Sequence, residues 1–174
     1  MSDTGFVTQI GEGFAGDGAD AAHVNTVLGA RGGPVETAWA SALAQPSSGH
    51  TPFMVVVRPG LAVKPLTLFV NKASIASERH GTLTWGAAQA GIARGVGQAV
   101  ADGVIEGADA LLLIAAVWVN PDATEAGAVF DNNAAACRAA LVAGAAGEPS
   151  VGAVLAEVSR PWNPYFAPDS GFGD

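Results

Sequence analysis

Hydrophobic and polar positions along the chain predict a series of extended segments. A weak apolar alternation from Phe6 to Phe14 and a second extended stretch from Ala21 to Leu28 flank a glycine-rich turn, which predicts a β-hairpin. Later segments rich in β-branched, leucine or aromatic residues predict buried strands. These segments are Thr51–Val57, Leu66–Val70 and Ala110–Val119.

Helical spacing predicts helices between these strands. Pro34 suits the first turn of a helix that continues to Ala44, because a proline lacks the amide that would have no partner there. Thr84 is placed to cap a helix from Trp85 to Asp102, and a further helix begins at Pro121 and Asp122 and runs to about Ala145.

Two sequence features bear on packing. The predicted second helix carries Gly91, Gly95 and Gly97, which lower helix propensity and are explained by close helix packing. The last segment, 160–174, is aromatic but broken by three prolines. We expect it to cross a surface in extended form and to contact a neighbouring subunit.

About five strands and three helices, with hairpin-like pairs separated by helices, indicate an α/β (α+β) fold. We expect a two-layer sandwich of a mixed sheet with helices on one face. A chain of 174 residues is long enough for one substantial core, so residues 1–174 are expected to form a single domain.

Composition narrows the class of protein. Hydrophobic residues make up 49% of the chain and charged residues 14%, which favours burial against copies of itself. A net charge of -8 argues against a nucleic-acid partner, because binding to phosphates needs a basic patch. The most apolar run, Leu111–Val119, is far shorter than the roughly 20 residues of a membrane-spanning helix, and the start lacks a basic, apolar leader. With Cys137 alone, we expect a protein of a reducing cytoplasm without a disulfide or a cysteine zinc site.

Polar chemistry concentrates between Gly16 and Ala38. His23 and Asn25 are two residues apart in a predicted strand, so their side chains share one face. His23 can exchange a proton near neutral pH, but the pattern alone slightly favours a hydrogen-bonded core histidine. Asp17 and Asp20 are expected to form turns, because their spacing does not supply the oxygen ligands of a metal site.

Other polar residues leave alternatives open. Lys72 follows an apolar strand and fits either a solvated lysine or a buried amine for anion or carbonyl chemistry. Gln89 fits a ligand contact or a helix surface, and Arg31 fits a brace for its turn. His50 and His80 fall in predicted turns and are expected to be solvated. The glycine-rich turn is not followed by a helix, which excludes a dinucleotide-binding loop.

The chain closely resembles the formaldehyde-activating enzyme family over nearly its whole length. The segments that carry the resemblance are GEGFAGDGADAAHVN, GARGGPVETA, KPLTLFVNKASI and GAAQAGIARGVGQAVADGVI, followed by GEP at Gly147. The family condenses formaldehyde with tetrahydromethanopterin to the methylene derivative and water, in one-carbon metabolism, methylotrophy and formaldehyde detoxification. The resemblance also implies a homopentamer, a pterin bound between subunits, no metal, and a fold like the ribosomal-protein domain-2-like fold.

Site residues follow from the resemblance by position. His23 matches the family's proposed general acid, while Lys72 and Gln89 match residues that contact the pterin. The remaining positions differ from the family: Asn25 replaces an aspartate, Met54 a leucine and Ser74 a threonine. The change to Asn25 removes a charge and adds hydrogen-bond donors.

The resemblance implies a reaction in which a pterin nitrogen adds to formaldehyde and an acid then protonates the hydroxyl group that leaves as water. His23 would be that acid. Two alternatives to a lyase of this type are a paralogue that uses a different pterin or aldehyde, and a non-catalytic protein that senses or buffers formaldehyde or a pterin. Activity measured with a panel of cofactors would distinguish the first alternative from the lyase. Tight binding without turnover would favour the second.

Overall fold

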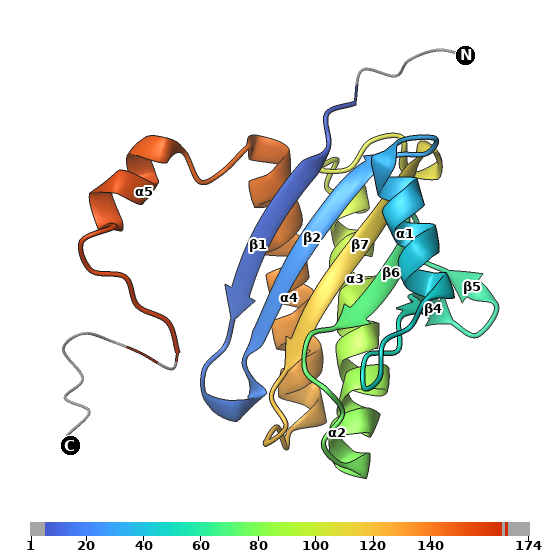
Figure 1. The fold of residues 1–174 in the computed structure, drawn as a ribbon, viewed down its shortest axis with the longest axis vertical. Coiled ribbons are helices and arrows are strands. Elements are labelled where there is room, and N and C mark those ends of the chain that lie inside the picture. The colour runs from blue at the N-terminus through green and yellow to red at the C-terminus, as the bar shows by residue number, and fades with distance from the viewer. Residues whose placement is uncertain (1–5, 165, 167–174) are drawn as a thin grey trace.

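The computed structural model describes residues 6–164 and 166, and its centre is a mixed sheet of five strands (Figure 1). Only β6 and β7 run parallel, and the other neighbouring pairs are antiparallel. In spatial order the strands are β1 (Gln9–Ala15), β2 (Ala22–Ala30), β7 (Leu111–Val119), β6 (Leu66–Asn71) and β3 (Phe53–Met54).

A layer of helices covers one face of this sheet (Figure 1). It contains α2 (Glu78–Thr82), which continues through a π-helical stretch (Leu83–Ala88) into α3 (Gln89–Ala101), and the long α4 (Ala126–Ala146). Short 3₁₀ turns occupy Gly18–Asp20 and Ala108–Ala110. The two-layer sandwich expected from the sequence is confirmed.

The elements outside the two layers are smaller. Helix α1 (Pro34–Ala44) lies over the opposite face at one end of β2 and β7 (Figure 1). A small two-stranded sheet contains β4 (Val56–Arg58) and β5 (Leu61–Ala62). Helix α5 (Val151–Glu157) stands apart from the sheet (Figure 1). No helix in the described part of the chain is long and apolar enough to cross a membrane.

Alternation along the strands separates the two faces of the sheet. In β2, Val24 and Leu28 are buried against the helix layer, whereas His23 and Asn25 are only partly buried on the other face. The core lies between sheet and helices, and its largest buried apolar side chains include Phe69, Leu28, Ile92, Leu113 and Val96. The uncovered face is therefore free to carry polar chemistry.

Glycines allow helices and strands to approach closely. A Cβ atom at Gly11 or Gly13 of β1 would overlap the carbonyl oxygens of Ala140 and Ala136 in α4. Gly91 and Gly95 of α3 face α4 in the same manner. The prediction of close packing is confirmed for these two helix glycines, whereas Gly97 faces open space.

Some boundaries differ from the sequence prediction. The second helix begins at Glu78, because the Ser77 side chain accepts a hydrogen bond from the His80 backbone N and caps it. Thr84 is buried inside the π-helical stretch, so its prediction as a cap was wrong. The third helix begins at Ala126. The expected strand 51–57 divides at Val55, whose backbone bonds both Thr67 and Val63.

The C-terminal segment is described only in part. Residues 160–164 and 166 lie beyond α5, an element that the sequence did not predict, and Asn163 and Phe166 pair their backbones across a tight turn. The remainder of the expected extended segment lies outside the described residues.

The contrast between two glycines of α3 gives a stability prediction. An alanine Cβ at Gly95 would lie 2.6 Å from the Ala134 carbonyl oxygen and 2.9 Å from Cys137 Cβ, so we expect Gly95→Ala to lower the free energy of unfolding by about 2 kcal/mol. Gly97→Ala meets no atom within 4 Å and should raise it by about 0.5–1 kcal/mol through helix propensity. Urea unfolding of both variants measures this difference, and equal stabilities would contradict the close approach of the two helices.

Candidate active site

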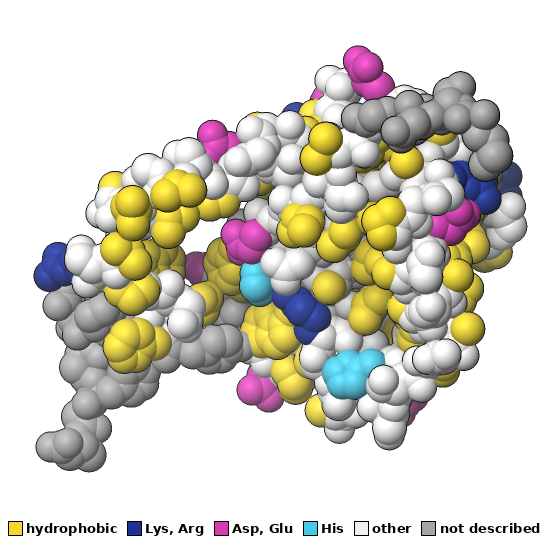
Figure 2. Space-filling model, turned by 45° about the horizontal axis from the view of Figure 1, so that its top comes forward, with side chains coloured by type: hydrophobic (Ala, Val, Ile, Leu, Met, Phe, Trp, Pro, Cys, Tyr) yellow, Lys and Arg dark blue, Asp and Glu magenta, His cyan; other side chains and the backbone are white. Residues whose placement is uncertain are grey.

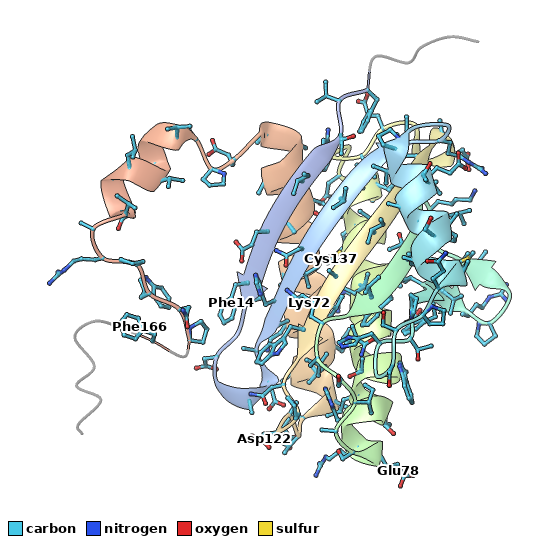
Figure 3. All side chains as sticks on the ribbon, in the orientation of Figure 1. Phe14, Lys72, Glu78, Asp122, Cys137 and Phe166 are labelled. Carbon is cyan, nitrogen blue, oxygen red and sulfur yellow. The ribbon has the colours of Figure 1, made fainter. Side chains whose placement is uncertain are left out.

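The uncovered face of the sheet carries a cluster of polar side chains. Figure 2 shows an acidic side chain, a histidine and a basic side chain that adjoin one another among hydrophobic side chains. The cluster joins three strands: Glu12 comes from β1, His23 and Asn25 come from β2, and Lys72 directly follows β6. Figure 3 places Lys72 over the middle of the sheet, with Phe14 at its edge strand.

Hydrogen bonds connect the four side chains in one chain of contacts. Lys72 Nζ donates to Asn25 Oδ1 at 2.8 Å and lies 3.2 Å from His23 Nδ1. On the other side of the ring, His23 Nε2 lies 3.0 Å from Glu12 Oε1. The imidazole therefore faces a basic side chain at Nδ1 and an acidic side chain at Nε2.

Strand register explains how the cluster forms. Glu12 pairs with Asn25, so their side chains point to the same face, and His23 shares that face two residues earlier. Lys72 continues the parallel pairing of β6, because its backbone N donates to the Val117 oxygen at 2.8 Å. Its side chain then reaches over β7 toward β2.

The contacts fix the tautomer of His23. A carboxylate only accepts hydrogen bonds, so Nε2 carries the hydrogen that it donates to Glu12. An ammonium only donates, so the lone pair of Nδ1 accepts from Lys72. A proton placed on Nδ1 would require Lys72 to give up one of its own protons. Lys72 and His23 therefore compete for one proton.

Burial and charge alter the acidity of both groups. Burial lowers the pKa of His23, the nearby Lys72 lowers it further, and Glu12 opposes both through its charge and its hydrogen bond. Burial also lowers the pKa of Lys72, again with Glu12 acting in the opposite direction. The site thus shifts the imidazole and the amine toward their neutral forms, relative to the same groups in water.

A recess lies beside the cluster. It has a volume of about 830 Å³ and is lined by Glu12, Phe14 and His23 on the sheet and by Trp162, Asn163 and Pro164 of the C-terminal segment. Its lining is predominantly apolar, with polar groups at His23 and Glu12. A mostly apolar recess with a few polar groups is typical of a site for a small organic molecule.

Met54 and Ser74, two further expected site residues, have contacts outside the cluster. Met54 pairs with Leu68, which shares the face of Lys72 four residues later, so Met54 lies on the same side of the sheet. Ser74 Oγ lies 3.2 Å from His50 Nε2, and His50 Nδ1 donates to the Asn71 oxygen at 2.7 Å.

Gln89 lies apart from these residues. It begins α3 in the helix layer, and its Oε1 accepts from the Val56 backbone N at 2.6 Å. Within residues 6–164 and 166, no hydrogen bond joins Gln89 or Met54 to the cluster.

The structure corrects the expectation for two histidines. His80 is buried, its Nδ1 accepts from the Ala76 backbone N, and its Nε2 donates to the Val119 oxygen, so it holds α2 to β7. His50 is partly buried and bonded through both ring nitrogens. The residues around both histidines are typical of turns, and the sequence does not indicate partners as distant as Asn71 and Val119.

Glu12 is the site residue that sequence reasoning missed. It lies in a glycine-rich stretch that resembles a turn, yet Gly11 and Gly13 point to the helices and Glu12 points to the site. The two-residue period of that alternation was the available signal.

The remaining polar candidates have structural contacts. Asp20 accepts from the backbone N atoms of Thr124 and Glu125 ahead of α4, and Arg31 pairs with Glu36 beside its turn. Among the described residues, no group of three His, Cys, Asp or Glu side chains is arranged to hold a metal ion. Cys137 is buried under the sheet, which raises its pKa to about 12.

The cluster predicts opposite pKa shifts for two variants. Glu12→Gln removes the charge that favours the imidazolium, so we expect a lower pKa for His23 than in the wild type. Lys72→Met removes a nearby positive charge, so the pKa of His23 should rise. NMR titration of the His23 ring protons measures both, and shifts of the same sign would contradict the cluster.

Comparisons with known proteins show the family of this chain. The family model described as formaldehyde-activating enzyme (Fae) matches residues 10–166. A 5,6,7,8-tetrahydromethanopterin hydro-lyase of Methanosarcina barkeri is 38% identical over 160 residues, which cover 91% of this chain and 90% of that protein.

Bifunctional Fae/Hps enzymes are also similar. The enzyme of Methanosarcina barkeri is 35% identical over 91% of this chain, but the match covers only 44% of its own length. The enzyme of Archaeoglobus fulgidus is also 35% identical, over 90% of this chain and 40% of its own length. The chain therefore spans less than half the length of these two relatives. From the match along residues 10–166 and the near full-length similarity to the hydro-lyase, the chain belongs to the formaldehyde-activating enzyme family.

Proposed function

We propose that this protein is a lyase that condenses formaldehyde with tetrahydromethanopterin, or a closely related reduced pterin, to the methylene-pterin and water. The observation that carries the proposal is the Glu12–His23–Lys72–Asn25 cluster, which lies open to a recess on a chain of this family. The name of the hydro-lyase relative supports the choice of pterin.

His23 is proposed as the acid and base of the reaction. A pterin nitrogen adds to the formaldehyde carbon and loses a proton, and the resulting hydroxymethyl group must gain a proton before water leaves. The imidazole can transfer that proton, and Glu12 holds the ring through Nε2–H and stabilises its charged form. The second pterin nitrogen then closes the ring.

The surrounding residues are proposed to hold the pterin. Asn25 and Ser74 offer hydrogen-bonding groups, Lys72 offers an amine, and Met54 offers an apolar side chain on the same face. Because the condensation also proceeds without an enzyme, proximity of the two reactants beside one well-placed proton donor is proposed to supply the rate enhancement.

Gln89 is proposed to act across a subunit interface in a homopentamer. In its own chain it lies in the helix layer, so a contact with the pterin requires the site of a neighbouring subunit. An exposed apolar stripe on α5 supports such an assembly. It comprises Val151, Val154, Leu155 and Val158, with Trp162 and Phe166 exposed beyond it. A cytoplasmic location and a part in methylotrophy stay predictions.

Kinetics of methylene-pterin formation test the proposal. With tetrahydromethanopterin and formaldehyde, we expect the wild type to exceed the spontaneous rate and His23→Ala to lose about a hundred- to ten-thousand-fold in kcat/KM. The buried His80→Gln variant is the matched control for loss of an imidazole outside the site. Equal rates for wild type and His23→Ala with both tetrahydromethanopterin and tetrahydrofolate would contradict the assignment.

Native mass spectrometry tests the assembly. We expect the wild type at five times the 17.3 kDa chain mass, and Leu155→Glu with Val158→Glu at the mass of one chain, because two charges would enter the apolar interface. Glu157→Gln, on the same helix, should leave the assembly unchanged. A monomeric wild type would contradict the proposed pentamer.

A further inference from the structure

The position of Lys72 leads to an inference about the path of formaldehyde. We propose that the Lys72 amine captures formaldehyde covalently, as a carbinolamine and then an iminium ion, before the carbon passes to the pterin. In this order of steps the hydroxyl group that His23 protonates is first carried by Lys72, and the pterin nitrogen attacks the iminium carbon in place of free formaldehyde. The final transfer rests on the proposed function, whereas the capture itself needs only formaldehyde and this chain.

The contacts of Lys72 suit a nucleophile. Its Nζ lies between His23 Nδ1 at 3.2 Å and Asn25 Oδ1 at 2.8 Å. The first atom is a base that can take a proton from the ammonium, and the second holds the amine in place through a neutral acceptor. Burial lowers the pKa of Lys72, which increases the population of the reactive form.

Glu12 completes the proton path. When His23 takes the proton on Nδ1, the imidazolium still donates through Nε2 to the Glu12 carboxylate 3.0 Å away, which stabilises the charge. The lysine nitrogen then has a free lone pair. The His23 imidazolium, which received the lysine's proton, lies beside it. One shared proton thus serves both the attack and the loss of water.

Asn25 has a specific part in this arrangement. An aspartate at the same place would form an ion pair with the Lys72 ammonium and oppose its deprotonation. The carboxamide accepts the same hydrogen bond without a full negative charge. The asparagine at this position therefore favours a free amine.

The capture balances without any other reactant. Lys72 Nζ first gives a proton to His23, and its lone pair then bonds to the carbonyl carbon while the oxygen takes the proton back from the imidazolium. His23 next removes a proton from the nitrogen to give the neutral carbinolamine, and returns it to the hydroxyl group. The C–O bond breaks, water leaves, and the nitrogen lone pair forms the C=N bond. One ammonium and one formaldehyde become one iminium and one water.

Transfer regenerates the lysine. A pterin nitrogen attacks the iminium carbon, its proton moves to the lysine nitrogen, and the C–Nζ bond breaks to leave the carbon on the pterin. Closure by the second pterin nitrogen releases a proton, which Lys72 accepts to return to the ammonium. No electrons are gained or lost in the sequence.

The chain has only two lysines, so the reactivity of Lys72 can be compared with that of Lys64 in the same protein. Lys64 forms an exposed ion pair with the Asp109 carboxylate at 3.2 Å, and within the described residues no imidazole is hydrogen-bonded to it. Lys72 has no such direct carboxylate contact within the described residues, and its closest partners are an imidazole and an amide.

Reductive trapping with isotope-labelled formaldehyde tests the capture. The full-length protein is treated at pH 7 with ¹³C-formaldehyde and cyanoborohydride, which reduces an iminium to an N-methyl group, and each lysine is followed by peptide mass spectrometry. We expect Lys72 to be methylated severalfold faster than Lys64, because His23 Nδ1 lies 3.2 Å from the Lys72 amine and can take its proton. Labelling of Lys72 no faster than that of Lys64 would overturn the inference.

Variants at Asn25 test the role of charge. Asn25→Asp should slow labelling of Lys72 by about tenfold at pH 7, because the new carboxylate adds to Glu12 in favouring the ammonium. Among the described residues, His23 is the titratable side chain bonded to Lys72. Asn25→Ala removes the hydrogen bond without adding charge, so Lys72 should stay faster than Lys64. An equal slowing in both variants would contradict the argument from charge.

A last pair of variants separates covalent capture from simple binding. Lys72→Arg keeps a cation but cannot form the iminium, so we expect kcat for methylene-pterin formation to fall to the spontaneous rate, whereas a purely binding role would change KM alone. Lys64→Arg is the control and should leave the labelling of Lys72 unchanged. Efficient condensation by the wild type without labelling of Lys72 would refute the capture alone. Labelling without condensation would support the capture and refute the proposed function.

Discussion

The close contact between β1 and α4 sets the geometry of the whole molecule. At Gly11 and Gly13 no side chain separates the strand from the helix, so the two backbones approach to a distance that any Cβ would prevent. The residue between these glycines must then point away from the helices. This alternation places Glu12 on the uncovered face, beside the imidazole that it holds.

Much of the fold follows from periodicity that is visible in the sequence. The apolar runs of β2, β6 and β7 and the helical spacing of α1, α3 and α4 reflect burial on one or both faces, and burial constrains residue type strongly. The start of α2 was missed because Gly81 and Gly86 weaken the local helical signal, although Ser77 gives a good cap. The short α5 was missed because no core packing shapes its sequence.

The site was predictable only in pieces. The spacing of His23 and Asn25 places them on one face, and the structure confirms it. No spacing indicates that Lys72, more than forty residues later, reaches them, because that contact depends on the order of the strands. In register, the small Ala116 of β7 lies between Asn25 and Val70, which leaves room for a long side chain to cross. The expected roles of these residues came from family resemblance, not from their pattern.

The scarcity of amines has a consequence for the survival of the protein itself. Formaldehyde links amines on protein surfaces through methylene bridges, and such cross-links inactivate proteins that handle it. Six of the eight basic residues here are arginines, whose guanidinium groups keep their protons, and Lys64 is engaged by Asp109. The surface therefore offers the aldehyde few sites for damage. The composition of the chain protects the fold from its own substrate, while Lys72 stays reactive on the uncovered face.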